Sequence, residues 1–298
     1  MKIINQEQKE FWNEKKGDIW VSLEHHIDKM LGPLGDQAIK ILKPKVGEKI
    51  LDIGCGTGST SQTLSNLVGE SGLVTGIDIS KPILNFAEKK RESKKIKNIN
   101  FIQADAQNHQ FSNLNYDAIF SRFGVMFFED PIAAFKNIKK SLVGNGRLTF
   151  VCWSKREEND WINLSSNVAS QFLELPPKAN PKDPGPFAFE DYFYIKEILI
   201  KAGWSNIKIK SYKKKIIIGD TLDSAADFLS RMGPMSVPFE NANEQTKEKV
   251  VSALKECYSK YFTPKGVEFH FSSWIVSALN PQISKLQKKV DRTEYCLW

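Results

Sequence analysis

The sequence predicts an α/β protein with a doubly wound, mostly parallel sheet. Between residues 46 and 154, short apolar runs alternate with stretches of helical periodicity. A glycine-rich stretch, residues 54–58, joins the first apolar run to the first helix, and Asp78 and Asp105 end the next two runs. Parallel strands joined by helical crossovers form a sheet covered on both faces, which binds ligands beyond the carboxyl ends of its strands.

Each element of this part has its own signal. Five strands are predicted, at residues 48–54, 72–80, 99–106, 116–124 and 147–154. Ser80 is the predicted N-cap of the helix after the second strand, with Pro82 in its first turn. Asp130 and Pro131 open the helix over residues 131–142, which Gly144-Asn145-Gly146 is expected to end. The apolar positions that share one face of this helix are Ile132, Phe135, Ile138 and Leu142.

The rhythm changes after residue 154. We expect helices at 160–175, 191–204 and within 221–264, a proline-rich loop at 176–189, and strands at 206–218 and 267–279. The chain therefore divides into an N-terminal helical lid (1–44), a ligand-binding core (45–154) and a remainder (155–298). The remainder completes the sheet and carries helical cap insertions at about 155–190 and 221–264. The tail after Pro281 gives no prediction.

Composition narrows the class of protein. Of the 298 residues 41% are hydrophobic, no apolar run is long enough to cross a bilayer, and the N-terminus lacks the apolar region of a secretory signal. A cytoplasmic protein is expected. The cysteines are scattered without metal-ligand spacing, which predicts reduced thiols and no metal site: Cys55, Cys152, Cys257 and Cys296. The net charge of +7 comes from dispersed lysine clusters, more typical of solvated surface than of a nucleic-acid interface.

The spacing of the glycines distinguishes between nucleotide ligands. The dinucleotide fingerprint is G-x-G-x-x-G, whereas the glycines here are Gly54, Gly56 and Gly58. A P-loop is excluded, because no Gly-Lys-Ser/Thr follows. Asp52, just before the turn, is unfavourable beside a pyrophosphate and favourable beside an ammonium group.

Two further acids fit the rest of one ligand. Asp78 lies about 20 residues after the turn, where an acid accepts both hydroxyls of a ribose. Asp105 is placed to accept from an adenine amino group, with the backbone of Ala106 reading the ring edge. An adenosine whose 5′ end carries a cationic amino acid in place of phosphates satisfies all three acids. That ligand is S-adenosylmethionine.

Four segments, in order, resemble the motifs of class I S-adenosylmethionine-dependent methyltransferases: LDIGCGTG (51–58), GIDIS (76–80), FIQADA (101–106) and YDAIFSRFGVMFFEDP (116–131). They are most similar to the small-molecule branch that includes the ubiquinone/menaquinone-biosynthesis type. The resemblance is strong over residues 45–155 and weaker elsewhere. It implies a Rossmann-like sheet of seven strands, the last antiparallel, with S-adenosylmethionine as cofactor and S-adenosylhomocysteine as product.

The resemblance also implies roles for matching residues. The glycine turn would surround the methionine part, Ile79 would pack on the adenine, and residues 121–123 would lie near the sulfonium. The expected cofactor-binding residues are Asp52, Gly54, Cys55, Gly56, Gly58, Asp78, Ile79, Asp105, Ala106, Ser121 and Phe123. The expected acceptor is a small organic molecule, methylated at oxygen or carbon. Its pocket candidates, which serve core packing equally well, are Trp12, Trp20, Arg122, Trp153 and Phe189.

Several alternatives stay open. Taken singly, Asp78 and Asp105 are also explained as helix N-caps or turn acids. No general base is identified, and the histidine candidates are His25, His26, His109 and His270. Residues 121–124 read Ser-Arg-Phe-Gly and lack the Asn/Asp-Pro-Pro-aromatic motif of enzymes that methylate planar amines. An RNA-modifying methyltransferase and a non-enzymatic adenosyl-binding module remain alternatives, and the oligomeric state is open.

Overall fold

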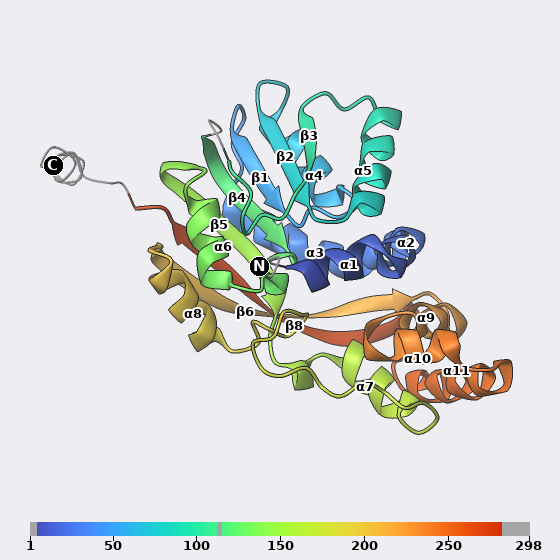
Figure 1. Ribbon diagram of the computed structural model, residues 1–298. Coiled ribbons are helices and arrows are strands. Elements are labelled where there is room, and N and C mark those ends of the chain that lie inside the picture. Colours follow the sequence, from blue (N-terminus) through green and yellow to red (C-terminus); the bar gives the residue numbers. More distant parts are fainter. Residues whose placement is uncertain (1–4, 112–114, 282–298) are drawn as a thin grey trace, which may run out of the picture.

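The computed structural model describes residues 5–111 and 115–281. Its centre is one mixed sheet with the strand order β3-β2-β1-β4-β5-β8-β6, to which β7 adds a short pairing with β8 (Figure 1). The strands are β1 (Lys49–Ile53), β2 (Leu73–Asp78), β3 (Ile99–Gln103), β4 (Tyr116–Arg122), β5 (Leu142–Trp153), β6 (Ser205–Gly219), β7 (Phe262–Thr263) and β8 (Gly266–Leu279). Strands β1 to β5 pair in parallel, and β8 pairs antiparallel with both β5 and β6. The predicted seven-stranded, mostly parallel sheet is confirmed, with β7 as an unpredicted two-residue addition.

Crossover helices cover this sheet: α4 (Ser59–Val68), α5 (Lys81–Ser93) and α6 (Pro131–Lys139). The two predicted N-caps are present, because the Ser80 hydroxyl accepts the Ile83 N–H and the Asp130 carboxylate accepts the Ala133 N–H. The central strands are buried on both faces, as a parallel sheet under two helical layers requires. Their carboxyl ends therefore meet at one edge, where the loops are free to form a site.

The prediction for residues 140–146 is wrong. Helix α6 ends at Lys139, where Lys140 N–H and Ser141 N–H turn back to the Asn137 and Ile138 carbonyls. Leu142 starts β5 instead of belonging to the helix, and Gly144-Asn145-Gly146 lies inside that strand. The register against β4 shifts there, with Asn145 at a φ of 65°, so the glycines permit a strand irregularity and do not stop a helix.

The N-terminal helices are α1 (Gln6–Asn13), α2 (Lys15–Ser22) and α3 (Glu24–Leu42). Helix α3 packs against the strands β4, β5, β6 and β8, whereas α2 packs against α5 and α1 against α2. Helix α3 buries one apolar side, including Ile27, Leu34 and Leu42. Figure 1 shows α1 and α2 between the core strands and a second group of helices. Both short helices lie beside the carboxyl edge of the sheet, where α1 bonds the residues that follow β2 and β3.

The second group of helices, referred to below as the cap, surrounds the far ends of the long strands β6 and β8 (Figure 1). It consists of α7 (Asp160–Ala169), α9 (Leu222–Ser230), α10 (Ser236–Asn241) and α11 (Glu244–Ser259), with the 3₁₀ turns η2 (Arg156–Glu158) and η3 (Gly233–Met235). Helix α8 (Tyr192–Lys201) packs instead against α6 and β6, and the turn η1 (Val125–Phe127) follows β4. Within the described residues no helix has the length and apolarity needed to span a membrane. Cys296 lies outside the described part of the chain.

Candidate functional site

The glycines of the turn after β1 are not all required for the same reason. Gly54, Gly56 and Gly58 have φ of 65°, 54° and 78°, a region that glycine adopts without strain. A Cβ on Gly54 would meet the backbone of Gly124 at 2.7 Å, and one on Gly58 would meet the Phe101 ring at 2.8 Å. A Cβ on Gly56 would meet nothing nearer than the Trp20 indole nitrogen at 3.9 Å. Packing inside the protein explains two of the glycines, while Gly56 keeps open space beside the backbone.

Asp78 ends β2 beside this turn. Its Oδ2 accepts the Gly56 N–H at 2.8 Å, and its Oδ1 accepts the Ser80 N–H at 2.9 Å. Burial raises the pKa of this carboxyl, and the backbone N–H groups oppose the shift. Each carboxylate oxygen has a second lone pair left for a ligand hydroxyl.

Asp105 follows β3 and lies next to the first residue of the described chain. Its Oδ2 accepts the Asn5 side-chain N–H at 3.0 Å, and its Oδ1 accepts the Gln107 N–H at 2.9 Å. Asn5 also bonds Glu129 twice, through its backbone N–H at 2.7 Å and its side-chain oxygen at 2.8 Å. Helix α1 is thereby tied to the adenine end of the expected site.

The other end of α1 is tied down in the same way. The Asn13 side chain donates to the Ile79 carbonyl at 3.0 Å and accepts the Lys81 N–H at 2.8 Å. The Ser80 hydroxyl donates to the Trp12 carbonyl at 2.7 Å. No sequence pattern marked Asn5 or Asn13, because each makes contacts with residues that are distant along the chain.

Asp52 is fully buried behind the turn. Its Oδ2 accepts the hydroxyls of Thr60 and Ser61, both at 2.7 Å, whereas its Oδ1 has no hydrogen-bond partner among the described residues. Burial raises the pKa of Asp52 to about 6, against the two hydroxyls and the positive charge of Arg122. A buried carboxylate oxygen without a donor is costly, so ionised Asp52 carries a poorly compensated negative charge behind the turn.

The residues at the carboxyl end of β4 lie between the glycine turn and the cap. The Ser121 hydroxyl is buried and bonds the Ile53 carbonyl at 2.8 Å and the Gly124 N–H at 3.2 Å. Phe123 stands at a φ of 60° and stacks on Trp153, with ring centroids 4.2 Å apart. The Cys55 thiol is buried and its pKa lies well above the ordinary value because of burial, so this cysteine is not a thiolate.

One cavity of about 950 Å³ connects these groups with the cap. Eight of the expected cofactor-binding residues line it: Gly54, Cys55, Gly56, Asp78, Ile79, Asp105, Ala106 and Phe123. Asp52, Gly58 and Ser121 are not on its wall; they lie behind the turn. Of the expected acceptor-pocket residues Trp12, Trp20, Arg122 and Trp153 line the cavity, while Phe189 packs in the core against Phe135 and Phe150.

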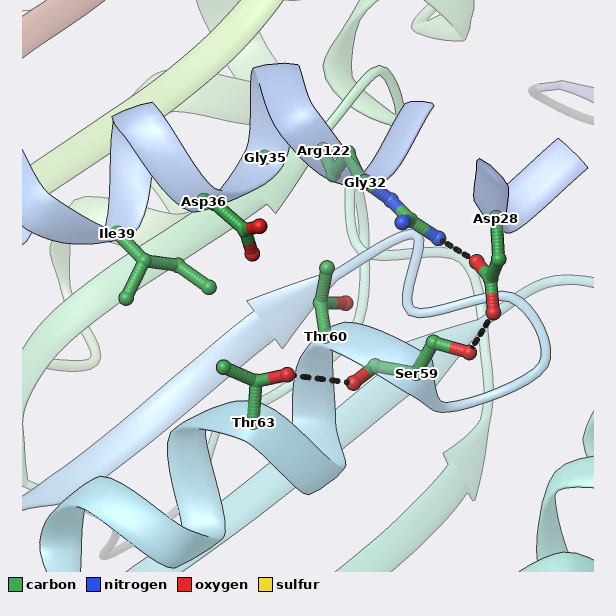
Figure 2. Close-up of a pocket in the computed structure, with 9 residues that line it drawn as sticks. All are labelled: Asp28, Gly32, Gly35, Asp36, Ile39, Ser59, Thr60, Thr63 and Arg122. Carbon is green, nitrogen blue, oxygen red and sulfur yellow. Dashed lines mark hydrogen bonds and ion pairs between the residues drawn. The ribbon is translucent and has the colours of Figure 1, made fainter. Parts of the chain in front are cut away.

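Arg122 lies on the wall, but its guanidinium already has a partner. It forms an ion pair with Asp28 of α3 at 2.7 Å, and the same carboxylate accepts the Ser59 hydroxyl at the start of α4 (Figure 2). Lys90 and Glu24 extend this network to α5. Arg122 therefore joins α3 to the glycine turn from behind the cavity.

The four histidines lie away from the cavity wall: His25, His26, His109 and His270. His26 stacks on Phe228, His109 packs edge-on against Phe111, and exposed His270 bonds Asp160 at 3.0 Å. The sequence also missed the residues at the far end of the cavity. Arg156, Trp161 and Phe187 line it there, and only their positions in the cap bring them together.

The open side of Gly56 and the carboxylates of Asp78 and Asp105 lie on the cavity wall, where the sequence predicts a cationic adenosine derivative, and the charge of Asp52 lies behind them. Comparison with known proteins gives the class of the domain. Residues 44–177 match the family described as "Methyltransferase domain". Aklanonic acid methyltransferase DauC of Streptomyces sp. strain C5 is 30% identical over 51% of this chain and 64% of its own length. Demethylmenaquinone methyltransferase of Staphylococcus saprophyticus is 29% identical over 59% of this chain and 78% of its own.

Solved structures share the fold. Phosphoethanolamine N-methyltransferase 2 of Haemonchus contortus, in complex with S-adenosyl-L-methionine, has a TM-score of 0.51 at 19% identity, covering 83% of this chain and 53% of that one. The chain contains a class I S-adenosylmethionine-dependent methyltransferase domain, whose cofactor is S-adenosylmethionine.

Proposed function

We propose that this enzyme methylates a small organic acceptor at an oxygen or carbon atom. The observation that supports this most strongly is the continuity of the cavity. Its wall runs from Gly56 and Asp78, past Phe123 and Trp153, to the cap helix α7. At about 950 Å³ it is at the upper end of the range for small-molecule sites, so it has room for a nucleoside and a second small molecule together. The two sequence relatives described above are also named for small acceptors.

Within this proposal the residues divide the cofactor between them. Gly56 leaves room for the methionine part and Asp52 compensates its ammonium group. Asp78 accepts the ribose hydroxyls, and Asp105 and Ala106 read the adenine. The N-terminal segment 1–44 acts as a lid, because α1 is held over this edge at both of its ends. The segment 45–154 is the cofactor-binding core, and the cap insertions at about 155–190 and 221–264 bound the acceptor.

When bound, S-adenosylmethionine would supply a sulfonium methyl group; an in-line nucleophile of the acceptor would bond the methyl carbon as the carbon–sulfur bond breaks and S-adenosylhomocysteine leaves. The chain contributes alignment and the exclusion of water. Phe123 and Trp153 present apolar surface where the acceptor meets the cofactor, and the lid covers the opposite side. Alignment of this kind is worth about 7–11 kcal/mol of the barrier. The histidines lie off the wall, so none of them is proposed as the base.

The charges on the wall favour a small acceptor over RNA. Five cationic side chains line the cavity and five acidic ones accompany them, so it is not a positive groove. The cations are Lys16, Arg122, Arg156, Lys178 and Arg231; the acids are Asp78, Asp105, Glu157, Asp183 and Glu190. RNA binding relies on excess positive charge along the backbone path. The space beyond Phe123 also argues against a module that only binds the nucleoside.

The proposal is tested by methyl transfer from methyl-labelled S-adenosylmethionine. The full chain is incubated separately with a small-metabolite extract and with total RNA from the same cells. Label is expected in the small-metabolite fraction, and mass spectrometry of the product then gives the acceptor atom. Label that enters RNA, with none in the small-molecule fraction, would contradict the proposal.

A further inference from the structure

The cavity wall beyond the cofactor edge is a row of aromatic side chains. Phe123 stacks on Trp153 at 4.2 Å, Trp153 lies 5.4 Å from Trp161, and Trp161 stacks on Phe187 at 6.2 Å. All four line the same cavity. We refer to Phe123, Trp153, Trp161 and Phe187 as the aromatic row. It begins beside the glycine turn and ends in the cap, so it is a continuous apolar surface along which a flat molecule can lie.

Arg156 stands at the cap end of this row. Its guanidinium carbon lies 5.6 Å from the centre of the Phe187 ring, and its Nη2 has one long contact, 3.5 Å, to the Ser166 hydroxyl. No carboxylate of the described residues lies within ion-pair distance of it. Arg122 and Arg231 on the same wall are each paired with an aspartate at 2.7 Å. Arg156 is therefore the wall arginine whose charge is left for a ligand.

No neighbouring side chain takes the place of a ligand as the partner of the Arg156 guanidinium. Burial lowers the pKa of Arg156, although Glu157 and Glu190 oppose the shift. Glu190 is engaged with the Arg156 backbone, whose N–H donates to it at 3.3 Å. The Trp161 indole N–H nearby is buried and has no partner among the described residues. Arg156 has no carboxylate partner and the Trp161 indole N–H has no acceptor among the described residues, which indicates that the bound molecule brings oxygen atoms to this end of the cavity.

We infer that the acceptor is a flat aromatic molecule carrying a carboxylate, with its rings along the aromatic row and the carboxylate on Arg156. The inference rests on the proposed function and names the acceptor class for the same site. A guanidinium matches a carboxylate with two parallel hydrogen bonds, and stacked rings hold planar molecules. The carboxylate then marks the end of the acceptor that is remote from the methylated atom, and Arg156 sets both specificity and orientation.

Binding to the full chain saturated with S-adenosylhomocysteine tests this without turnover. The probes for calorimetry are 2-naphthoate, 2-naphthylmethanol, which keeps the rings without the charge, and cyclohexanecarboxylate, which keeps the charge without the rings. 2-Naphthoate is expected to bind at least about tenfold more tightly than either control, as for one charge-assisted contact. Arg156→Gln removes this preference, whereas Arg91→Gln, the matched change at an arginine that is paired with Glu88 and does not line the cavity, alters 2-naphthoate affinity by less than about twofold.

A second variant separates the rings from the charge. Phe187 is only partly buried, and Phe187→Ala is expected to weaken both naphthyl probes alike, while Arg156→Gln weakens 2-naphthoate alone. Equal affinities of 2-naphthoate and 2-naphthylmethanol, or no measurable naphthoate binding to the S-adenosylhomocysteine complex, would overturn the inference. Equal losses in Arg156→Gln and Arg91→Gln would also overturn it. The proposed function fails separately, through label transfer to RNA.

Discussion

The Asp78 carboxylate accepts the Gly56 N–H at 2.8 Å and so joins the end of β2 to the glycine turn after β1. The same carboxylate holds the Ser80 N–H at the start of α5. Asp78 thus shapes the turn before any ligand arrives. Asp78 therefore has a structural role as well as its proposed contact with the ribose. Its substitution is expected to affect both the shape of the turn and the binding of the cofactor.

Asp78→Ala is expected to weaken S-adenosylhomocysteine binding by about 100-fold, as for the loss of two charge-assisted hydrogen bonds. Calorimetry on the full chain measures it. Asp117→Ala is the matched control, because Asp117 also accepts a backbone N–H, that of Lys49 at 2.8 Å, at the amino end of β1. That variant should bind within about twofold of wild type. Affinity near wild type in Asp78→Ala would contradict the ribose role.

The three glycines of the turn should respond differently to alanine. In Gly56→Ala the new Cβ enters open space, so the melting temperature falls by only about 2–4 °C, the cost of one strained φ. Its affinity for S-adenosylhomocysteine should fall by about tenfold or more, because the methyl occupies ligand space. Gly54→Ala meets the Gly124 backbone and should lose more stability than Gly56→Ala. Wild-type affinity of Gly56→Ala for S-adenosylhomocysteine would contradict the proposed place of the methionine part beside Gly56.

The sheet order and the helix starts could be predicted, because apolar runs, N-caps and prolines are local signals. Residues 140–146 could not. Gly144 and Gly146 read as a helix stop, and only the pairing with β4 shows that they permit an irregular strand. In the glycine turn, the sequence predicts one reason for all three glycines, whereas Gly54 is required by Gly124, a residue far along the chain.

The positions of the strand-end acids in the site could also be predicted. Strand-end acids follow from the order of the motifs, so Asp78 and Asp105 meet at one edge as expected. Contacts made by whole elements do not follow from it. Asn5 and Asn13 act through the placement of α1 over the edge, and Arg156 acts through the packing of the cap. No spacing in the sequence contains that information.

The raised pKa of Asp52 predicts that ligand binding releases a proton near pH 6. Its pKa of about 6 lies above the usual value, so the folded protein binds this proton more tightly than the unfolded chain. Its contribution to stability therefore grows as pH falls from about 6 toward 4. An ammonium group near Oδ1 favours the ionised form and returns the pKa toward its usual value. S-adenosylhomocysteine binding at pH 6 should then release about half a proton.

Calorimetry at pH 6 in buffers of different ionisation enthalpy measures this release. Asp52→Asn should abolish it. The matched ligand is 5′-methylthioadenosine, which keeps the nucleoside and lacks the amino acid; its binding should release no proton from Asp52. Equal release with both ligands would place the ammonium group away from Asp52.

The lid predicts slow release of the cofactor product. Asn5→Ala with Asn13→Ala removes the side-chain bonds that hold α1 at both ends. Each such bond is worth roughly 0.5–1.5 kcal/mol, so the dissociation rate of S-adenosylhomocysteine should rise by about tenfold or more. Stopped-flow displacement measures the rate. Gln6→Ala, which loses a bond to Glu10 within α1, is the control. An unchanged rate in the double variant would exclude α1 as the lid.

The most direct test is a crystal structure of the full chain with S-adenosylhomocysteine. The account predicts the ribose hydroxyls on Asp78, the adenine amino group at Asp105 and the amino acid part over Gly56, with α1 closed above them. The cavity beyond Phe123 should stay open beside the sulfur. A nucleoside bound elsewhere, or one that leaves Asp78 and Asp105 without contact, would contradict the central claim.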